Sequence, residues 1–155
     1  MSELKYQLER FLLDSVAVRP NPGYSDTSAE NTGTISVGVS VATHNEDKCK
    51  RQVILEIDLQ PKAGAEDRCF PYSISIVGRA FFLFQKGSEE NDVERFLNIN
   101  GSAMLFGLLR GQISQITSQA VHGQFLLPPC NFVELYEQRN NTSSGSKPKR
   151  VQGKR

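Results

Sequence analysis

Alternation of apolar and polar side chains along three segments is the feature that most constrains how this 155-residue chain can fold. In residues 34–41, isoleucine and valine at odd positions alternate with threonine, serine and glycine at even positions. The alternation returns in residues 53–60 and 72–76, and residues 80–84 follow as an apolar run. A period of two predicts strands with one buried and one polar face. Because the connections are short, we expect an antiparallel meander.

Another strand is expected near the N-terminus, over residues 4–18. Its apolar side chains at positions 11–13 fall on both faces, which predicts a bulge or burial on both sides. Residues 19–33 are rich in proline, glycine and small polar side chains and predict a long loop.

The second half of the chain carries a helical pattern. Residues 102–121 place apolar side chains three and four positions apart, which predicts an amphipathic helix. Ser102 is the expected N-cap, and Gly123 the expected left-handed stop. A shorter helical piece is expected around residues 92–98.

A proline-containing apolar loop, residues 124–129, must interrupt the helical pattern. Asn131 and Glu134 then form a capping pair that predicts a short second helix. Strands first and helices last predict an α+β domain over residues 1–139. In it, the long helix, the loop and the short helix pack on one face of a four-stranded antiparallel sheet.

Four small residues share one side of the long helix: Gly107, Gly111, Ser114 and Ser118. Each glycine costs a helix about 1 kcal/mol relative to alanine. One interpretation is a helix that tolerates two glycines, and the other is close packing against another helix. We expect the second, with these four residues in an interface between subunits.

The apolar residues of the loop and second helix also allow two interpretations. They are Phe125, Leu126, Leu127, Phe132, Val133 and Tyr136. In the first interpretation they seal the domain's own core. In the second they form a groove with unfilled backbone edges that accepts extended, non-native polypeptide.

Residues 100–138 resemble the end of the SecB export chaperone family. The resemblance lies in Asn-Gly-Ser-Ala-Met-Leu-Phe-Gly-Leu-Leu-Arg at 100–110, Ile-Thr-Ser-Gln-Ala at 116–120 and Phe-Leu-Leu-Pro-Pro-Cys-Asn-Phe-Val-Glu-Leu-Tyr at 125–136. The family has an apolar helix start, a small-residue turn, a proline-containing loop and a Val-Asn-Phe-x-x-Leu motif in this order. The chain departs from it at Gly107, where the family has proline.

The resemblance implies a holding chaperone that binds unfolded or precursor polypeptides without ATP or any other cofactor. It implies a homotetramer, a dimer of dimers with the long helix between dimers. Export members are strongly acidic and contact the translocase motor ATPase, whereas this chain has a net charge of +1. We therefore expect weak binding to the motor or none, and an alternative role as a SecB-like chaperone dedicated to one client, such as an antitoxin.

Residues 140–155 contain five lysines and arginines, no acidic residue and no apolar period. This composition predicts a disordered basic tail. The tail leaves open a third class, a nucleic-acid-associated module whose binding weakens steeply with salt. A fourth is a small-ligand-binding or structural protein in which the apolar loop completes the core.

The sequence offers little for catalysis. It contains neither a Gly-x-Ser-x-Gly elbow nor a phosphate-binding Gly-x-x-x-x-Gly-Lys loop. Cys49, Cys69 and Cys130 lack paired spacing and are expected to be free thiols, with no metal site. We predict a non-enzyme. The polar N-terminus and the absence of a long apolar run predict a cytoplasmic protein that does not insert into membranes.

Overall fold

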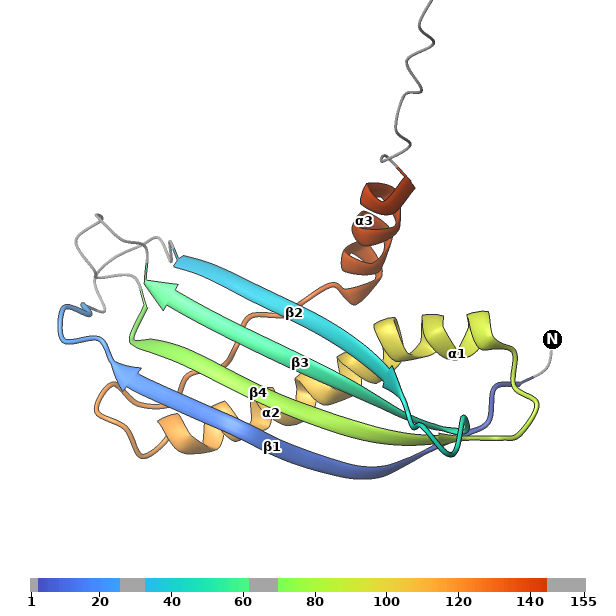
Figure 1. Ribbon diagram of the computed structural model, residues 1–155. Coiled ribbons are helices and arrows are strands. Elements are labelled where there is room, and N and C mark those ends of the chain that lie inside the picture. Colours follow the sequence, from blue (N-terminus) through green and yellow to red (C-terminus); the bar gives the residue numbers. More distant parts are fainter. Residues whose placement is uncertain (1–2, 26–32, 62–69, 145–155) are drawn as a thin grey trace, which may run out of the picture.

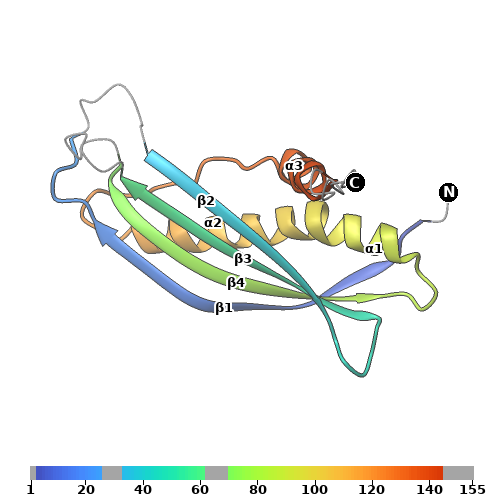
Figure 2. The ribbon, with the colours of Figure 1, turned by 45° about the horizontal axis from the view of Figure 1, so that its top comes forward.

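The computed structural model describes residues 3–25, 33–61 and 70–144. Its four strands are β1 (Tyr6–Pro20), β2 (Gly33–Thr43), β3 (Lys50–Pro61) and β4 (Tyr72–Phe84). The helical segments are α1 (Glu90–Phe96), the π-helical turn η1 (Leu97–Gly101), α2 (Ser102–Thr117) and α3 (Phe132–Ser144). The helices α1 and α2 cover one face of the sheet, and α3 lies beyond its β2 edge (Figures 1 and 2).

The strands form one antiparallel sheet in the order β1-β4-β3-β2. This confirms the predicted α+β fold and the meander from β2 to β4. The position of β1 was not evident from the sequence, because β1 pairs with β4, so that β1 and β2 are opposite edges. The register of β1 on β4 shifts between Leu8 and Arg10 and again between Leu13 and Ser15. Because opposite residues share a face, the two bulges bring Leu8, Phe11, Leu13 and Val16 all to the face of the buried even residues of β4, whereas Leu12 lies opposite Arg79 on the other face.

β4 is a single strand through Phe84, with buried residues at every even position. Gly78 lies in its middle because α2 passes close above: a Cβ built at Gly78 would be 2.5 Å from Leu109 Cδ2. Leu109 itself is fully buried. The glycine therefore allows a close approach of sheet and helix.

The long helix begins earlier than predicted. The segments α1, η1 and α2 follow one another without a break from Glu90 to Thr117. Ser102 is therefore not an N-cap. It is buried inside the helix, where its hydroxyl donates to the Leu97 carbonyl oxygen at 3.0 Å, across the π-helical turn.

The helix also ends earlier than predicted, at Thr117 rather than residue 121. The Thr117 hydroxyl donates to the Ile113 carbonyl oxygen at 2.7 Å and accepts the Phe125 N–H at 2.9 Å. Its side chain thus ties the helix end to the following loop. Gly123 has the expected left-handed conformation, with φ of 80°, but it lies in the turns that follow the helix.

The start of α3 agrees with the predicted cap, since Asn131 Oδ1 accepts the Glu134 N–H at 3.2 Å. The helix continues to Ser144. Residues 140–144, which the sequence assigned to the disordered tail, are therefore helical, and residues 145–155 lie outside the described part of the chain. None of the described helices is long and apolar enough to cross a bilayer.

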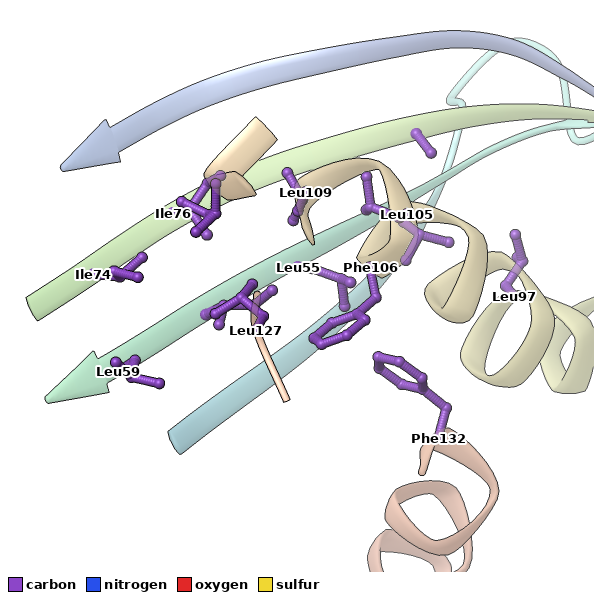
Figure 3. Packing of buried hydrophobic residues seen from close by; sticks show 14 of the residues in the cluster. Leu55, Leu59, Ile74, Ile76, Leu97, Leu105, Phe106, Leu109, Leu127 and Phe132 are labelled. Carbon is purple, nitrogen blue, oxygen red and sulfur yellow. The ribbon is translucent and has the colours of Figure 1, made fainter. Parts of the chain in front are cut away.

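The core lies between the sheet and the helices (Figure 3). Its fully buried large side chains come from every layer: Leu55, Ile57 and Leu59 of β3, Tyr72, Ile74, Ile76 and Phe82 of β4, Leu97, Leu105, Leu109 and Ile113 of the long helix, and Leu127 of the loop. β1 contributes no fully buried side chain of this kind. The predicted packing of helices on one sheet face is confirmed for α1 and α2, whereas the short helix α3 lies beyond the β2 edge.

Candidate functional site

An apolar groove lies where the proline loop and α3 meet the β2 edge. One cavity of about 340 Å³ is lined by Ile35, Val37, Phe106, Pro128, Pro129, Cys130, Asn131, Glu134, Leu135 and Gln138. A second, of about 420 Å³, is lined by Ile99, Ala103, Pro129, Cys130, Asn131, Phe132 and Val133. The two share residues 129–131, so they adjoin across the end of the loop. We call them together the α3 groove.

Residues of β2, η1, α2, the proline loop and α3 line the groove. Phe132, the first residue of α3, packs edge-to-face on Phe106 of α2, with ring centroids 5.7 Å apart (Figure 3). Pro128 and Pro129 keep the loop between α2 and α3 extended, since neither residue can continue a helix. The two prolines and the contact between Phe132 and Phe106 therefore set the shape of the groove.

The predicted groove residues separate into two groups. Phe132 and Val133 line the groove, and Val133 is 42% exposed. Leu127 is 1% exposed and belongs to the core (Figure 3). Phe125 packs edge-to-face against Phe70 and Tyr72, at centroid distances of 6.3 and 6.4 Å.

Leu126 and Tyr136 line neither of the two cavities, although Leu126 is 56% exposed. The structure also adds residues that the sequence did not single out. Ile35 and Val37 come from β2, Phe106 from α2 and Leu135 from α3. Nothing in the sequence indicated that the β2 residues line a groove, because the alternating pattern of a strand is the same at the edge and in the centre of a sheet.

The backbone at the β2 edge is the second feature of the site. His44 N–H donates to the Lys50 carbonyl oxygen at 3.0 Å, which makes these two residues a hydrogen-bonded pair of the β2–β3 hairpin. Hydrogen-bonded pairs alternate along an antiparallel ladder. The even residues of β2 therefore bond to β3, and the odd residues from Ile35 to Val41 direct their N–H and C=O groups outward.

One outward carbonyl is already occupied. Arg139 of α3 donates from Nη2 to the Val39 carbonyl oxygen at 2.7 Å. Its Nη1 donates to Asn98 Oδ1 at 3.3 Å. In the part of the chain that the structure describes, no hydrogen bond reaches the outward backbone groups of Ile35 or Val37.

The groove contains little charge apart from Glu134 near its rim. Cys130 is half-buried there, and this burial raises the pKa of its thiol. Such a surface suits apolar side chains. Among the described residues, no group of three His, Cys, Asp or Glu side chains is placed so that it could hold a metal ion.

The small-residue face of α2 points away from the core. A Cβ built at Gly107 or Gly111 would meet no atom within 4 Å. Met104 and Leu108 stand on the same side and are 40% and 38% exposed. A second apolar surface runs along β1, where Tyr6, Leu8, Leu13 and Val16 are each 38–41% exposed.

Comparison with solved structures found similar chains, and the first of the following two shows the fold. A SecB-like chaperone from Mycobacterium tuberculosis, solved in complex with a ChAD peptide from the HigA1 antitoxin, matches with a TM-score of 0.64 and 12% identity over 81% of this chain and 91% of that one. A protein of unknown function from Streptococcus agalactiae matches with a TM-score of 0.47 and 12% identity, over 83% and 100% of the two chains.

Among curated proteins, none matches. The family model described as preprotein translocase subunit SecB matches residues 15–143, which include all four strands in part or whole and the three helices. The fold, the long helix and the proline loop agree with that match. This chain belongs to the SecB family.

Proposed function

We propose that this protein is a holding chaperone that binds extended, apolar segments of non-native polypeptide in the α3 groove without ATP. The observation that carries the proposal is the position of the groove. Apolar side chains from β2, η1, α2, the proline loop and α3 line it, and it opens beside the backbone groups of Ile35 and Val37, which form no hydrogen bonds within the described chain. Membership of the SecB family supports a chaperone role.

Within the proposed site, the residues act at two depths. Val133 lines the groove and contacts the polypeptide there, and Leu126 and Tyr136, which are exposed and half-exposed and line neither cavity, extend the contact beyond the groove. Phe125, Leu127 and Phe132 are more buried and hold the loop and α3 in place beneath it. Because binding relies on apolar area and main-chain groups, it selects extended, apolar segments rather than one sequence.

We further propose that the working form is a cytoplasmic homotetramer, a dimer of dimers. Such an assembly needs two different self-complementary contacts on each subunit. The exposed face of Gly107, Gly111, Ser114 and Ser118 on α2 is one, since small side chains allow close helix packing. The apolar surface of Tyr6, Leu8, Leu13 and Val16 on the β1 edge is the other.

A dedicated client, such as an antitoxin, is the second candidate. The net charge of +1 favours it over a general export role, because the motor-binding export members of the family are acidic. The similar M. tuberculosis chaperone was solved with an antitoxin peptide, which supports this candidate. We propose that binding to the translocase motor is weak or absent.

The test is suppression of aggregation of an unfolding protein, without nucleotide. Val133→Asp puts a charge in the groove and should weaken suppression strongly. Val121→Asp is the matched control, because Val121 is 75% exposed and lines neither cavity. If the two variants suppressed aggregation equally, the groove would not be the binding site. Binding of oligonucleotide but not of unfolded protein by the wild type would instead favour the nucleic-acid class.

A further inference from the structure

The groove and the β2 edge offer two kinds of contact at the same residues. Ile35 and Val37 line the 340 Å³ cavity with their side chains. The same two residues direct N–H and C=O groups outward from the β2 edge, and α3 lies beyond that edge (Figure 1). A chain running along this edge would therefore meet main-chain partners and an apolar cavity together.

We propose that the bound polypeptide pairs with Ile35–Val37 as an antiparallel fifth strand of the sheet. We also propose that Arg139 stops this pairing at Val39. The inference rests on the proposed function, whose binding site it specifies. In an antiparallel pair, residues opposite each other share a face of the sheet. Client residues opposite Ile35 and Val37 thus point their side chains toward the cavity and their N–H and C=O groups toward β2.

Arg139 stops the added strand because it already donates the hydrogen bond to Val39 that the next client residue would otherwise donate. Its Nη2 donates to the Val39 carbonyl oxygen at 2.7 Å. Asn98, which is 8% exposed, accepts from Nη1 and donates its own amide to the Glu94 carbonyl oxygen at 2.9 Å. The guanidinium is therefore held from two sides, and a client strand must displace it to continue past Val37.

The π-helical turn has a place in this arrangement. Asn98 lies in η1, where the wider turn presents its side chain toward α3. Single π-helical turns are frequent at functional sites. The turn and Arg139 together position α3 against the edge strand.

Three synthetic peptides with identical side chains test the strand addition. Each has about eight residues that alternate leucine or valine with threonine, long enough to cover the open edge at roughly 3.3 Å per residue. The first is unmethylated, the second is N-methylated at its apolar residues and the third at its threonines. Methylation at the apolar residues removes the N–H groups aimed at β2 and should weaken binding about tenfold or more, since two or more hydrogen bonds are lost. The third peptide should bind as the first does.

Site-resolved amide exchange with the first peptide tests the role of Arg139. In the wild type, the peptide should slow exchange at Ile35 and Val37 and leave Val39 unchanged. In Arg139→Ala it should also slow exchange at Val39, because the peptide strand can then extend past Val37 and a peptide carbonyl oxygen can accept the Val39 N–H. Arg95→Ala, an exposed position on α1, is the control and should behave as the wild type does.

Equal binding of all three peptides would overturn the strand addition, even with the chaperone function intact. Protection of Val39 in the wild type would overturn the role of Arg139. If the protein bound neither the peptides nor an unfolded protein, the proposed function itself would be refuted. The three-peptide comparison uses the wild-type chain, so it remains decisive if Arg139→Ala does not fold.

Discussion

Arg51 at the start of β3 and Glu90 at the start of α1 form a two-pronged ion pair. Arg51 Nη1 donates to Glu90 Oε1 at 2.7 Å, and Nη2 donates to Oε2 at 2.6 Å. Arg51 is 8% exposed and also donates from Nε to the Lys48 carbonyl oxygen at 2.8 Å. The pair therefore fixes the point where the chain leaves the sheet and enters the long helix.

This pair predicts a pH dependence of stability. The hydrogen bonds from Arg51 lower the pKa of Glu90 below its ordinary value of about 4.3. A carboxyl with a lowered folded-state pKa stabilises the fold above its unfolded pKa, and this stabilisation is lost as pH falls through the folded pKa. Glu90→Gln should cost about 0.2–1 kcal/mol at neutral pH, since the Glu90 side chain is 66% exposed, and little at acidic pH. The measurement is the free energy of unfolding in urea, taken from neutral to acidic pH. Glu137→Gln on α3 is the control.

Gly78→Ala should destabilise the fold by about 1–3 kcal/mol, because the new methyl group overlaps the buried Leu109 side chain. Gly38→Ala is the matched control within the same sheet. A Cβ at Gly38 would have its nearest contact at an ordinary 3.8 Å, so this change should be neutral or slightly stabilising. In the double variant with Leu109→Val, the costs should not add, and a strictly additive cycle would contradict a direct clash.

Gly111→Leu tests the proposed assembly. Within one subunit the site is open, and replacing glycine should stabilise the helix by up to about 1 kcal/mol. In a close helix contact between subunits the same side chain should clash and shift the mass toward dimer. Light scattering combined with thermal unfolding separates the two effects. A monomeric wild type would contradict the interface.

Truncation tests where the domain ends. Removing residues 145–155 should leave folding and client binding intact, while salt-dependent binding to anionic surfaces falls because the five basic residues are lost. Removing residues 140–155 should cost stability, since it deletes the last turn of α3, where Thr142 and Ser143 donate to the Arg139 carbonyl oxygen at 3.0 and 2.9 Å. Equal unfolding curves for the two truncations would show that this turn contributes nothing.

Calorimetry against the basic tail of the translocase motor tests the export role. We expect weak or no binding by the full chain. Binding in the sub-micromolar range, about −8 kcal/mol or stronger, would contradict the dedicated-client candidate. The truncation of residues 145–155 is the informative comparison, because it removes positive charge and should strengthen any attraction to a basic partner.

Local periodicity accounts for what the sequence determined by itself. Alternation within residues 34–41 and 53–60 reports which side chains share a strand face, and the three- and four-residue spacing after Ser102 reports a helix face. Asn131 and Glu134 specify a cap through atoms three residues apart. These are short-range relations, so the strands, the main helix and the start of α3 could be predicted.

Long-range packing decided the rest. Nothing within β1 specifies that it pairs with β4, about 60 residues away in the chain and so the most distant of the strands in sequence. Ser102 looks like a cap locally, yet the preceding turns remain helical because Val93, Phe96 and Leu97 are buried against the sheet. Leu126 and Leu127 are adjacent and chemically identical, but only the loop's path over the core buries the second and leaves the first 56% exposed. The candidate site depends on that same path, since it brings Phe132 onto Phe106 and Arg139 onto the edge of β2.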